Sequence, residues 1–234
     1  MIGKTGISQQ QPVHKRALAK RDQRGNRLFD MLLAGLGLLV FSPAFILITL
    51  LLLGHGFQKP IFLQKRVGLN GNVFVIIKFR TLRDGTCRTV GPALLRSSKK
   101  LVSILRITGF DELPQFINVL RGEMSLVGPR PHSLADHRRF SASIADYRDR
   151  LTIKPGMTGW AQIHGWRGPV CNSVHLKERL GCDLQYIARH NPVLDCAILI
   201  RTALLPLGAL RRYHCRHRSC DGMKPCLQCP QRPA

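Results

Sequence analysis

The chain has 234 residues, enough for one domain with appendages and too few for two large hydrophobic cores. Its 36 Lys and Arg residues outnumber 13 Asp and Glu residues, which gives a formal net charge of +23 at pH 7. A hydrophobic fraction of 44% excludes a disordered or collagen-like chain. The charge predicts an anionic partner, which is a nucleic acid, a phospholipid or a phosphorylated substrate, and composition does not choose among these three.

A basic segment, residues 1–27, precedes an uncharged apolar run from Met31 to Leu53. As one straight helix this run would measure about 35 Å, against a hydrocarbon core of about 30 Å. Ser42 and Pro43 lie at its middle, where a proline removes a helical hydrogen bond and bends the chain. We therefore expect residues 28–53 to form a re-entrant helix–break–helix, although a single transmembrane span stays open.

Charged residues flank this segment on both sides. Lys and Arg residues lie from Lys15 to Arg27 before it and from Lys59 to Arg66 after it, so the positive-inside rule allows both ends to be cytoplasmic. Asp30 follows Arg27 by about one helical turn, which predicts an ion pair at the depth of the lipid headgroups. Alternatively, the two residues merely flank the segment.

Two strands joined by a tight turn are predicted next, over residues 59–68 and 73–80. Asn70-Gly71 lies between them, and both residues tolerate the positive φ that hairpin turns require. The hairpin would carry three cations that are candidates for binding substrate phosphate, although a solvated face is the plainer interpretation. These cations are Arg66, Lys78 and Arg80.

A helix is predicted over residues 94–105, and a shorter one follows an acidic pair. Pro114 suits a first helical turn and Gly122 suits the position just past a helix end. Asp111 and Glu112 would then lie at a helix N-terminus, where free N–H groups and the helix dipole keep carboxylates ionised. The pair is either a helix cap or part of an active site.

Prolines on both sides of Arg130 hold its backbone extended, which suits bidentate binding of a phosphate or forms a structural turn. Residues 154–168 contain four glycines and both tryptophans, and we expect a loop there. Residues 193–210 are apolar apart from Asp195 and Arg201, which favours an interfacial or core helix over a membrane span.

Paired carboxylates, fixed cations and a membrane segment together favour phosphoryl chemistry on a lipid-borne acceptor. Mg²⁺ is held by one or two carboxylates together with substrate phosphates. A carboxylate can also attack phosphorus and split one transfer into two steps.

Seven stretches, in order along residues 26–210, resemble the bacterial sugar transferases, which are monotopic polyprenyl-phosphate phosphoglycosyl transferases. The stretches are Arg27-Leu-Phe-Asp30, Ser42-Pro43, Gln64-Lys-Arg-Val-Gly68, Lys78-Phe-Arg-Thr81, Asp111-Glu-Leu-Pro-Gln115, Val127-Gly-Pro-Arg-Pro131 and Lys154-Pro-Gly-Met-Thr-Gly-Trp160. The expected fold class is α+β: a compact, mostly helical catalytic domain with a small β-hairpin and an N-terminal re-entrant membrane helix.

The resemblance implies that Asp111 attacks the sugar-linked phosphorus of a UDP-sugar and expels UMP. It implies that Glu112 holds Mg²⁺ and that Arg130 grips phosphate. Undecaprenyl phosphate then accepts the sugar phosphate, as the first membrane step of exopolysaccharide or related glycan synthesis. Gly165-Trp-Arg-Gly168 and Asp183-Leu-Gln-Tyr186 resemble the branch whose donors are UDP-glucose or UDP-galactose. The enzyme would lie in the bacterial inner membrane with its site on the cytoplasmic face.

Four parts are expected: a basic segment (1–27), the membrane helix (28–53), a cytosolic transferase domain (54–210) and a basic Cys/His tail (211–234). The chain resembles the short form of the family, and we expect reduced thiols. The stretch before Leu105-Arg106 lacks the Thr-x-x-Gly element common in the family. The tail is either a zinc knuckle or disordered. A basic membrane-anchored nucleic-acid-binding or scaffold protein is the alternative function; a nucleic-acid partner is not expected, and homo-oligomerisation stays open.

Overall fold

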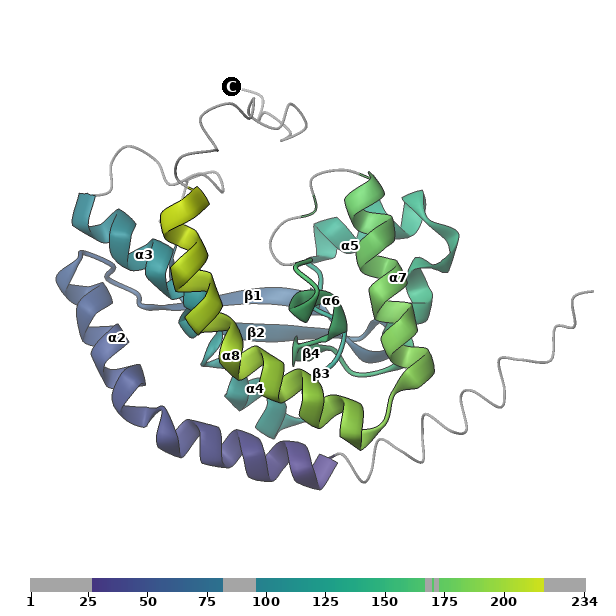
Figure 1. Ribbon diagram of the computed structural model, residues 1–234, viewed down its shortest axis with the longest axis horizontal. Coiled ribbons are helices and arrows are strands. Elements are labelled where there is room, and N and C mark those ends of the chain that lie inside the picture. Colours follow the sequence, from purple (N-terminus) through teal and green to yellow (C-terminus); the bar gives the residue numbers. More distant parts are fainter. Residues whose placement is uncertain (1–26, 82–95, 167–169, 171–172, 217–234) are drawn as a thin grey trace, which may run out of the picture.

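The computed structural model describes residues 27–81, 96–166, 170 and 173–216 (Figure 1). Helices (α), 3-10 helices (η) and strands (β) follow one another along the chain as a mostly helical α+β fold, as the sequence predicts. They are the helix Arg27–Val40, α2 (Ser42–Gly54), β1 (Ile61–Val67), η1 (Leu69–Gly71), β2 (Val73–Phe79), α3 (Arg96–Thr108), η2 (Phe110–Glu112), α4 (Gln115–Arg121), β3 (Ser125–Val127), α5 (Leu134–Ser143), η3 (Ala145–Thr152), β4 (Gly156–Thr158), α6 (Trp160–Ile163), α7 (Ser173–Arg189) and α8 (Pro192–Arg216).

The first two helices form a bent pair, Arg27–Val40 and α2, with an angle of 56° between them. The break falls where the sequence predicts it, because α2 begins at Ser42 with Pro43 in its first turn. The Ser42 hydroxyl donates a hydrogen bond of 2.7 Å to the Leu39 carbonyl just before the break. Within the described ranges no single helix is long and apolar enough to cross a membrane, whereas the bent pair together meets that length and composition. Figure 1 shows the pair curving around one side of the body.

The N-terminal helix is fastened to the body by its two charged residues. Arg27 donates hydrogen bonds to the carbonyls of Val119 and Leu120, at the C-terminal end of α4. Asp30 is buried and accepts a hydrogen bond of 3.1 Å from the Leu126 backbone N–H. The expected Arg27–Asp30 ion pair is therefore wrong. The last carbonyls of a helix lack intrahelical partners, and a buried carboxylate needs donors, so each residue binds the body instead.

The predicted hairpin is confirmed. Strands β1 and β2 pair antiparallel, with Phe62 opposite Lys78. The turn between them is the 3-10 helix η1, in which Asn70 has a φ of 55° and Gly71 a φ of 84°. These are the left-handed conformations that Asn and Gly tolerate.

A second, parallel sheet is formed by two short strands, β3 and β4. Residues 154–168 are therefore not a plain loop, because they contain β4 and the one-turn helix α6. Glycines are required there, since a Cβ at Gly156 would lie 2.0 Å from the Gly128 nitrogen and one at Gly159 would lie 2.2 Å from the Gly128 carbonyl oxygen. The glycines thus serve the close approach of two backbones.

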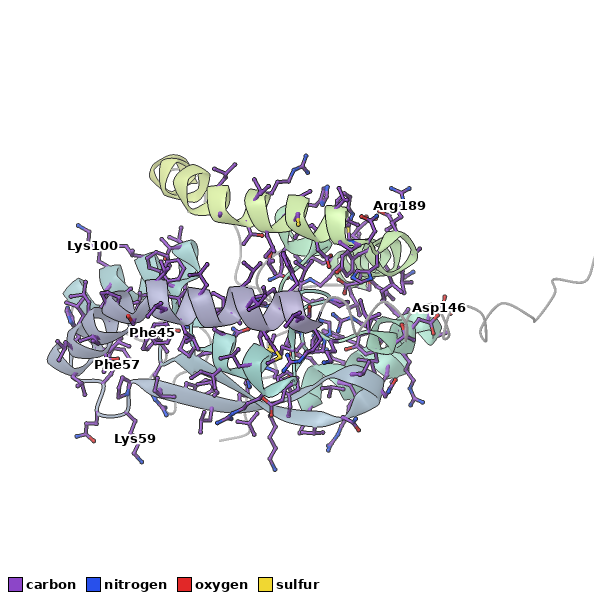
Figure 2. The ribbon with its side chains drawn as sticks, turned by 90° about the horizontal axis from the view of Figure 1, so that it is seen from below. Phe45, Phe57, Lys59, Lys100, Asp146 and Arg189 are labelled. Carbon is purple, nitrogen blue, oxygen red and sulfur yellow. The ribbon has the colours of Figure 1, made fainter. Side chains whose placement is uncertain are left out.

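Helix α8 confirms the helix predicted over residues 193–210 and continues across the expected boundary at 210 to Arg216. Its Ile198 is fully buried, while Val193 and Ile200 on other faces are exposed. Figure 2 shows α8 along one side of the body and the hairpin along the other, and the bent pair crosses in front of the body in this view. The central core joins all of these elements through Ala34, Phe74, Ile76, Val119, Met124, Leu126, Val127, Tyr186 and Ile198.

The remaining expectations are met in part. The helix predicted over 94–105 is α3, which ends three residues later, at Thr108. Cys182 and Cys196 are free thiols. The basic segment 1–26, the Cys/His tail from residue 217 and Gly168 lie outside the described residues.

Candidate active site

The acidic pair Asp111-Glu112 lies in η2, a single 3-10 turn that begins after Gly109. Pro114 occupies the N-cap of α4, so the helix proper starts at Gln115 and the pair stands one turn before it. Gly122 ends the helix with a φ of 82°, as the sequence predicts. The pair is therefore not part of the first helical turn, and its environment is set by neighbouring side chains.

Glu112 is held by two cations. Lys78 on β2 donates a hydrogen bond of 2.9 Å to its Oε1, and Arg130 contacts both carboxylate oxygens, with 3.0 Å to Oε2. Burial alone would raise the pKa of Glu112, but Arg130 and Lys78 outweigh it and hold that pKa well below its ordinary range. Glu112 is therefore a permanent anion that orients both cations.

Asp111 has the opposite character. Its burial, and next the adjacent charge of Glu112, raise its pKa from the ordinary 3.8 to about 6, against the opposing effects of Lys78, Arg130 and Arg106. A helix terminus is expected to lower the pKa of this carboxyl, and that direction is wrong for Asp111, because burial beside a like charge dominates. No hydrogen bond joins its side chain to another described residue, so the carboxylate is available to a ligand.

Of the other predicted cations, Arg66 stands next to the site and Arg80 does not contact the pair. Arg66 donates to the Pro131 carbonyl at 3.1 Å, beside Arg130, and its charge contributes to lowering the pKa of Lys78. Arg80 donates to the Lys59 carbonyl at 2.8 Å and lies 5.4 Å from the centroid of the Phe62 ring. The phosphate-binding role of Arg80 stays a prediction.

Arg106, near the end of α3, is a site residue that the sequence reasoning missed. It donates to the Thr81 hydroxyl at 3.1 Å, and it lowers the pKa of Asp111. Its only signal in the sequence is a basic residue in the last turn of a predicted helix, shortly before the acidic pair.

A second missed residue, Arg150, lies behind Arg130 and is buried in η3. Its guanidinium donates to the Arg130 backbone carbonyl at 2.6 Å and forms an ion pair of 2.9 Å with the buried Asp183 of α7. It also lies 3.1 Å from His132 Nδ1. This network fixes the backbone from which the Arg130 side chain extends.

Gln115 is the first residue of α4, directly after the segment that carries the acidic pair. Its side chain is 2% exposed, and its amide nitrogen has no hydrogen-bond partner among the described residues. A buried amide donor without a partner is costly, so this one is free to serve a ligand.

The pair also fits a divalent cation. Among the described residues no group of three or more His, Cys, Asp and Glu side chains could hold a metal. Two adjacent carboxylates suffice for Mg²⁺ when substrate phosphates supply the other oxygens. A cation here would relieve the repulsion between Asp111 and Glu112 that raises the pKa of Asp111.

Comparison with known proteins identifies the family. The family model for bacterial sugar transferases matches residues 21–208. The chain belongs to the bacterial sugar transferase family. It is 37% identical over 182 residues to the UDP-glucose:undecaprenyl-phosphate glucose-1-phosphate transferase of Caulobacter vibrioides, covering 75% of this chain and 67% of that protein.

Longer and shorter relatives also match. A protein of the same name from Escherichia coli is 36% identical over 194 residues, which cover 82% of this chain but 42% of that protein. The exopolysaccharide production protein PSS of Rhizobium leguminosarum is 34% identical over 188 residues, with 77% of this chain and 94% of that protein covered. The match thus includes every described site residue, from Arg66 to Asp183, within the family region.

Proposed function

We propose that this protein transfers a sugar 1-phosphate from a UDP-hexose to undecaprenyl phosphate and releases UMP, as the first membrane step of exopolysaccharide or related glycan synthesis. The observation that carries the proposal is the difference between the two carboxylates. Glu112 is held between Lys78 and Arg130, while Asp111 is half-buried, near cations and without a side-chain hydrogen bond to the described residues. The names of the relatives support the donor and acceptor classes.

In the first half-reaction Asp111 attacks the sugar-linked phosphorus of the donor. A bond forms between an Asp111 carboxylate oxygen and phosphorus, the bond from phosphorus to the bridging oxygen breaks, and UMP leaves with that oxygen. In the second half-reaction a phosphate oxygen of the polyprenyl acceptor attacks the same phosphorus. The bond to Asp111 then breaks, the carboxylate is restored and a polyprenyl diphosphate sugar is formed.

The surrounding cations stabilise the phosphoryl charge that develops in both steps. Arg130, held from behind by Arg150, and Lys78 are fixed by Glu112 before substrate binds, so little reorganisation accompanies the reaction. Arg106 approaches Asp111 from α3. Mg²⁺ bound by Asp111, Glu112 and donor phosphates would supply Lewis-acid stabilisation of the leaving group.

The bent pair would anchor the enzyme in the cytoplasmic leaflet as a re-entrant helix with both ends on one side. Its outward residues are strongly apolar and exposed, including Leu36, Leu39 and Leu47. On this view residues 54–210 form the cytosolic transferase part, and 1–27 and 211–234 are basic extensions. Single cysteines at position 10 and at the exposed position 58, in a chain whose other cysteines are replaced, should label from the same side; labelling from opposite sides would make the segment a span.

The test of the reaction is release of UMP from UDP-glucose and UDP-galactose by purified enzyme with undecaprenyl phosphate and Mg²⁺. Asp111→Asn should abolish turnover while membrane association is retained. Asp146→Asn is the matched control, because Asp146 is exposed and lies near one end of the molecule, where Figure 2 labels it. Retained UMP release by Asp111→Asn would contradict the nucleophile assignment.

Capture of the intermediate separates one step from two. Donor labelled in the sugar phosphate, incubated with enzyme and Mg²⁺ but no acceptor, should leave a covalent label on the peptide that contains Asp111. Lipid-linked sugar formed without such an adduct would favour direct transfer. Family membership and the assembled site favour a transferase over the nucleic-acid-binding or scaffold alternative, which predicts salt-sensitive DNA binding and no UMP release.

A further inference from the structure

The break in the bent pair packs directly against the segment that carries the acidic pair. Phe41, the residue at the break, has its ring centroid 6.3 Å from that of Phe110 and 6.4 Å from that of Phe116, against which it stacks. Phe110 immediately precedes Asp111 in η2, and Phe116 lies in the first turn of α4. These three rings form one aromatic cluster between the membrane-helix break and the candidate nucleophile.

Neighbouring contacts of the bent pair extend the same arrangement. Phe45 of α2, labelled in Figure 2, has its ring centroid 5.6 Å from that of Phe79. Phe79 follows Lys78 on β2, and successive strand residues point to opposite faces, so the helix lies behind the strand that presents Lys78. A Cβ on Gly37 would lie 2.8 Å from the Phe116 ring, which shows how closely helix and α4 approach.

The turn that carries the pair has little stability of its own. Its backbone hydrogen bonds run from Glu112 N–H to the Gly109 carbonyl at 3.0 Å and from Leu113 N–H to the Phe110 carbonyl at 3.4 Å, without a side-chain cap. A short 3-10 turn is a poor helix, so its position depends on the ion pairs of Glu112 on one side and on the packing of Phe110 on the other. Gly109 precedes it with a φ of 80°, and Phe110 is the ring through which the turn meets the bent pair.

We propose that Phe41 is a positioning residue: its ring, held at the break between the two membrane helices, fixes the turn that carries Asp111 through Phe110 and Phe116. The catalytic part of this inference rests on the proposed function. On this proposal the geometry of the helix break affects the active site, because a change in the bend moves Phe41 and so moves the rings that hold the turn carrying Asp111. Phe41 touches no substrate and acts only through the aromatic cluster.

The experiment compares three variants with the wild type in phosphatidylglycerol-containing nanodiscs. Phe41→Leu keeps apolar volume but loses the ring, Phe41→Tyr keeps the ring, and Phe29→Ala is the matched control. Phe29 lies in the helix Arg27–Val40, before the break, with 40% of its surface exposed. We expect Phe41→Leu to lower kcat for UMP release about tenfold with little change in KM, because misplacing a reacting group by a fraction of an ångström mainly lowers turnover. The kcat values of Phe41→Tyr and Phe29→Ala should stay within about twofold of wild type.

Backbone hydrogen exchange in the same nanodiscs gives a readout that does not depend on activity. Phe41→Leu should speed exchange of the Glu112 and Leu113 amides and leave those of α7 unchanged. Unchanged kcat together with unchanged exchange at η2 would overturn the proposal, as would a rise in exchange spread evenly over the body. If the wild type releases no UMP from either donor, the proposed function fails; selective exchange at η2 would still support the positioning role of Phe41, and its absence would still defeat it.

Discussion

The raised pKa of Asp111 predicts an acid limit to catalysis. Under the proposed function Asp111 is the nucleophile and must be ionised, and with a pKa of about 6 its carboxylate is nearly all ionised at pH 8. At pH 5 only about a tenth of it is ionised, so kcat/KM should fall roughly tenfold below its plateau. Activity is therefore lost as the pH falls through about 6, about two units above the ordinary aspartate value of 3.8.

Changing Glu112→Gln tests the cause of that limit. Glu112 is the second contributor that raises the pKa of Asp111, after burial, and its removal leaves Lys78 and Arg130, which lower it. The acid limb should then move to lower pH while the plateau falls, because the two cations lose the carboxylate that orients them. Raising Mg²⁺ should move the wild-type limb in the same direction, and this response should weaken in the variant.

The assay is the initial rate of UMP release at subsaturating donor, from pH 4.5 to 8.5 at fixed ionic strength and fixed Mg²⁺. The amount of membrane-bound enzyme is checked at each pH, so that unfolding is not read as titration. A wild-type limb centred near 4, or a Glu112→Gln limb that does not move downward, would refute the electrostatic reasoning for the pair.

Three further substitutions address residues around the site. Arg27→Met removes charged hydrogen bonds to the end of α4 and should lower the free energy of unfolding by about 2 kcal/mol. A denaturant titration in detergent measures this change, and Arg121→Met, at an exposed position of α4, is the control. Asp183→Asn leaves the buried Arg150 without its anion and should lower the free energy of unfolding by about 3 kcal/mol. In an enzyme that already carries Arg130→Ala, the Asp183→Asn change should lower kcat little further, because Arg150 acts through the Arg130 backbone. Additive losses of kcat would contradict that action. Gln115→Leu removes a buried amide nitrogen that has no hydrogen-bond partner among the described residues, and it should raise the free energy of unfolding by about 1 kcal/mol. The same change should lower kcat/KM, and unchanged activity would show that the amide binds no ligand.

Local signals were sufficient for much of the fold. The hairpin was predictable because Asn70-Gly71 favours one turn geometry, and the helix break because Pro43 cannot continue a helix. Gly122 marks the end of α4 for the same kind of reason. Each of these features depends on the backbone preferences of one or two residues, which the sequence displays directly.

Contacts across long sequence separations were not predictable in this way. Arg27 was assigned to its neighbour Asp30, but its partners are carbonyls at the end of α4, some 92 residues away. Arg150 reaches Arg130 and Asp183 only because η3, α7 and the Pro129–Pro131 segment meet in the folded chain. Local sequence spacing does not show which side chain will meet which orphan carbonyl or buried charge.

The error on Asp111 shows why the two carboxylates differ although they are adjacent. A helix-terminus argument treats Asp111 and Glu112 alike, since both are near the same dipole. In the folded chain the cations Lys78 and Arg130 bind one of them, and the resulting anion and its burial then raise the pKa of the other. Pairing Glu112 with the two cations leaves the Asp111 carboxylate without a hydrogen-bonded partner among the described residues. Under the proposed function, this difference is what makes Asp111 rather than Glu112 the nucleophile.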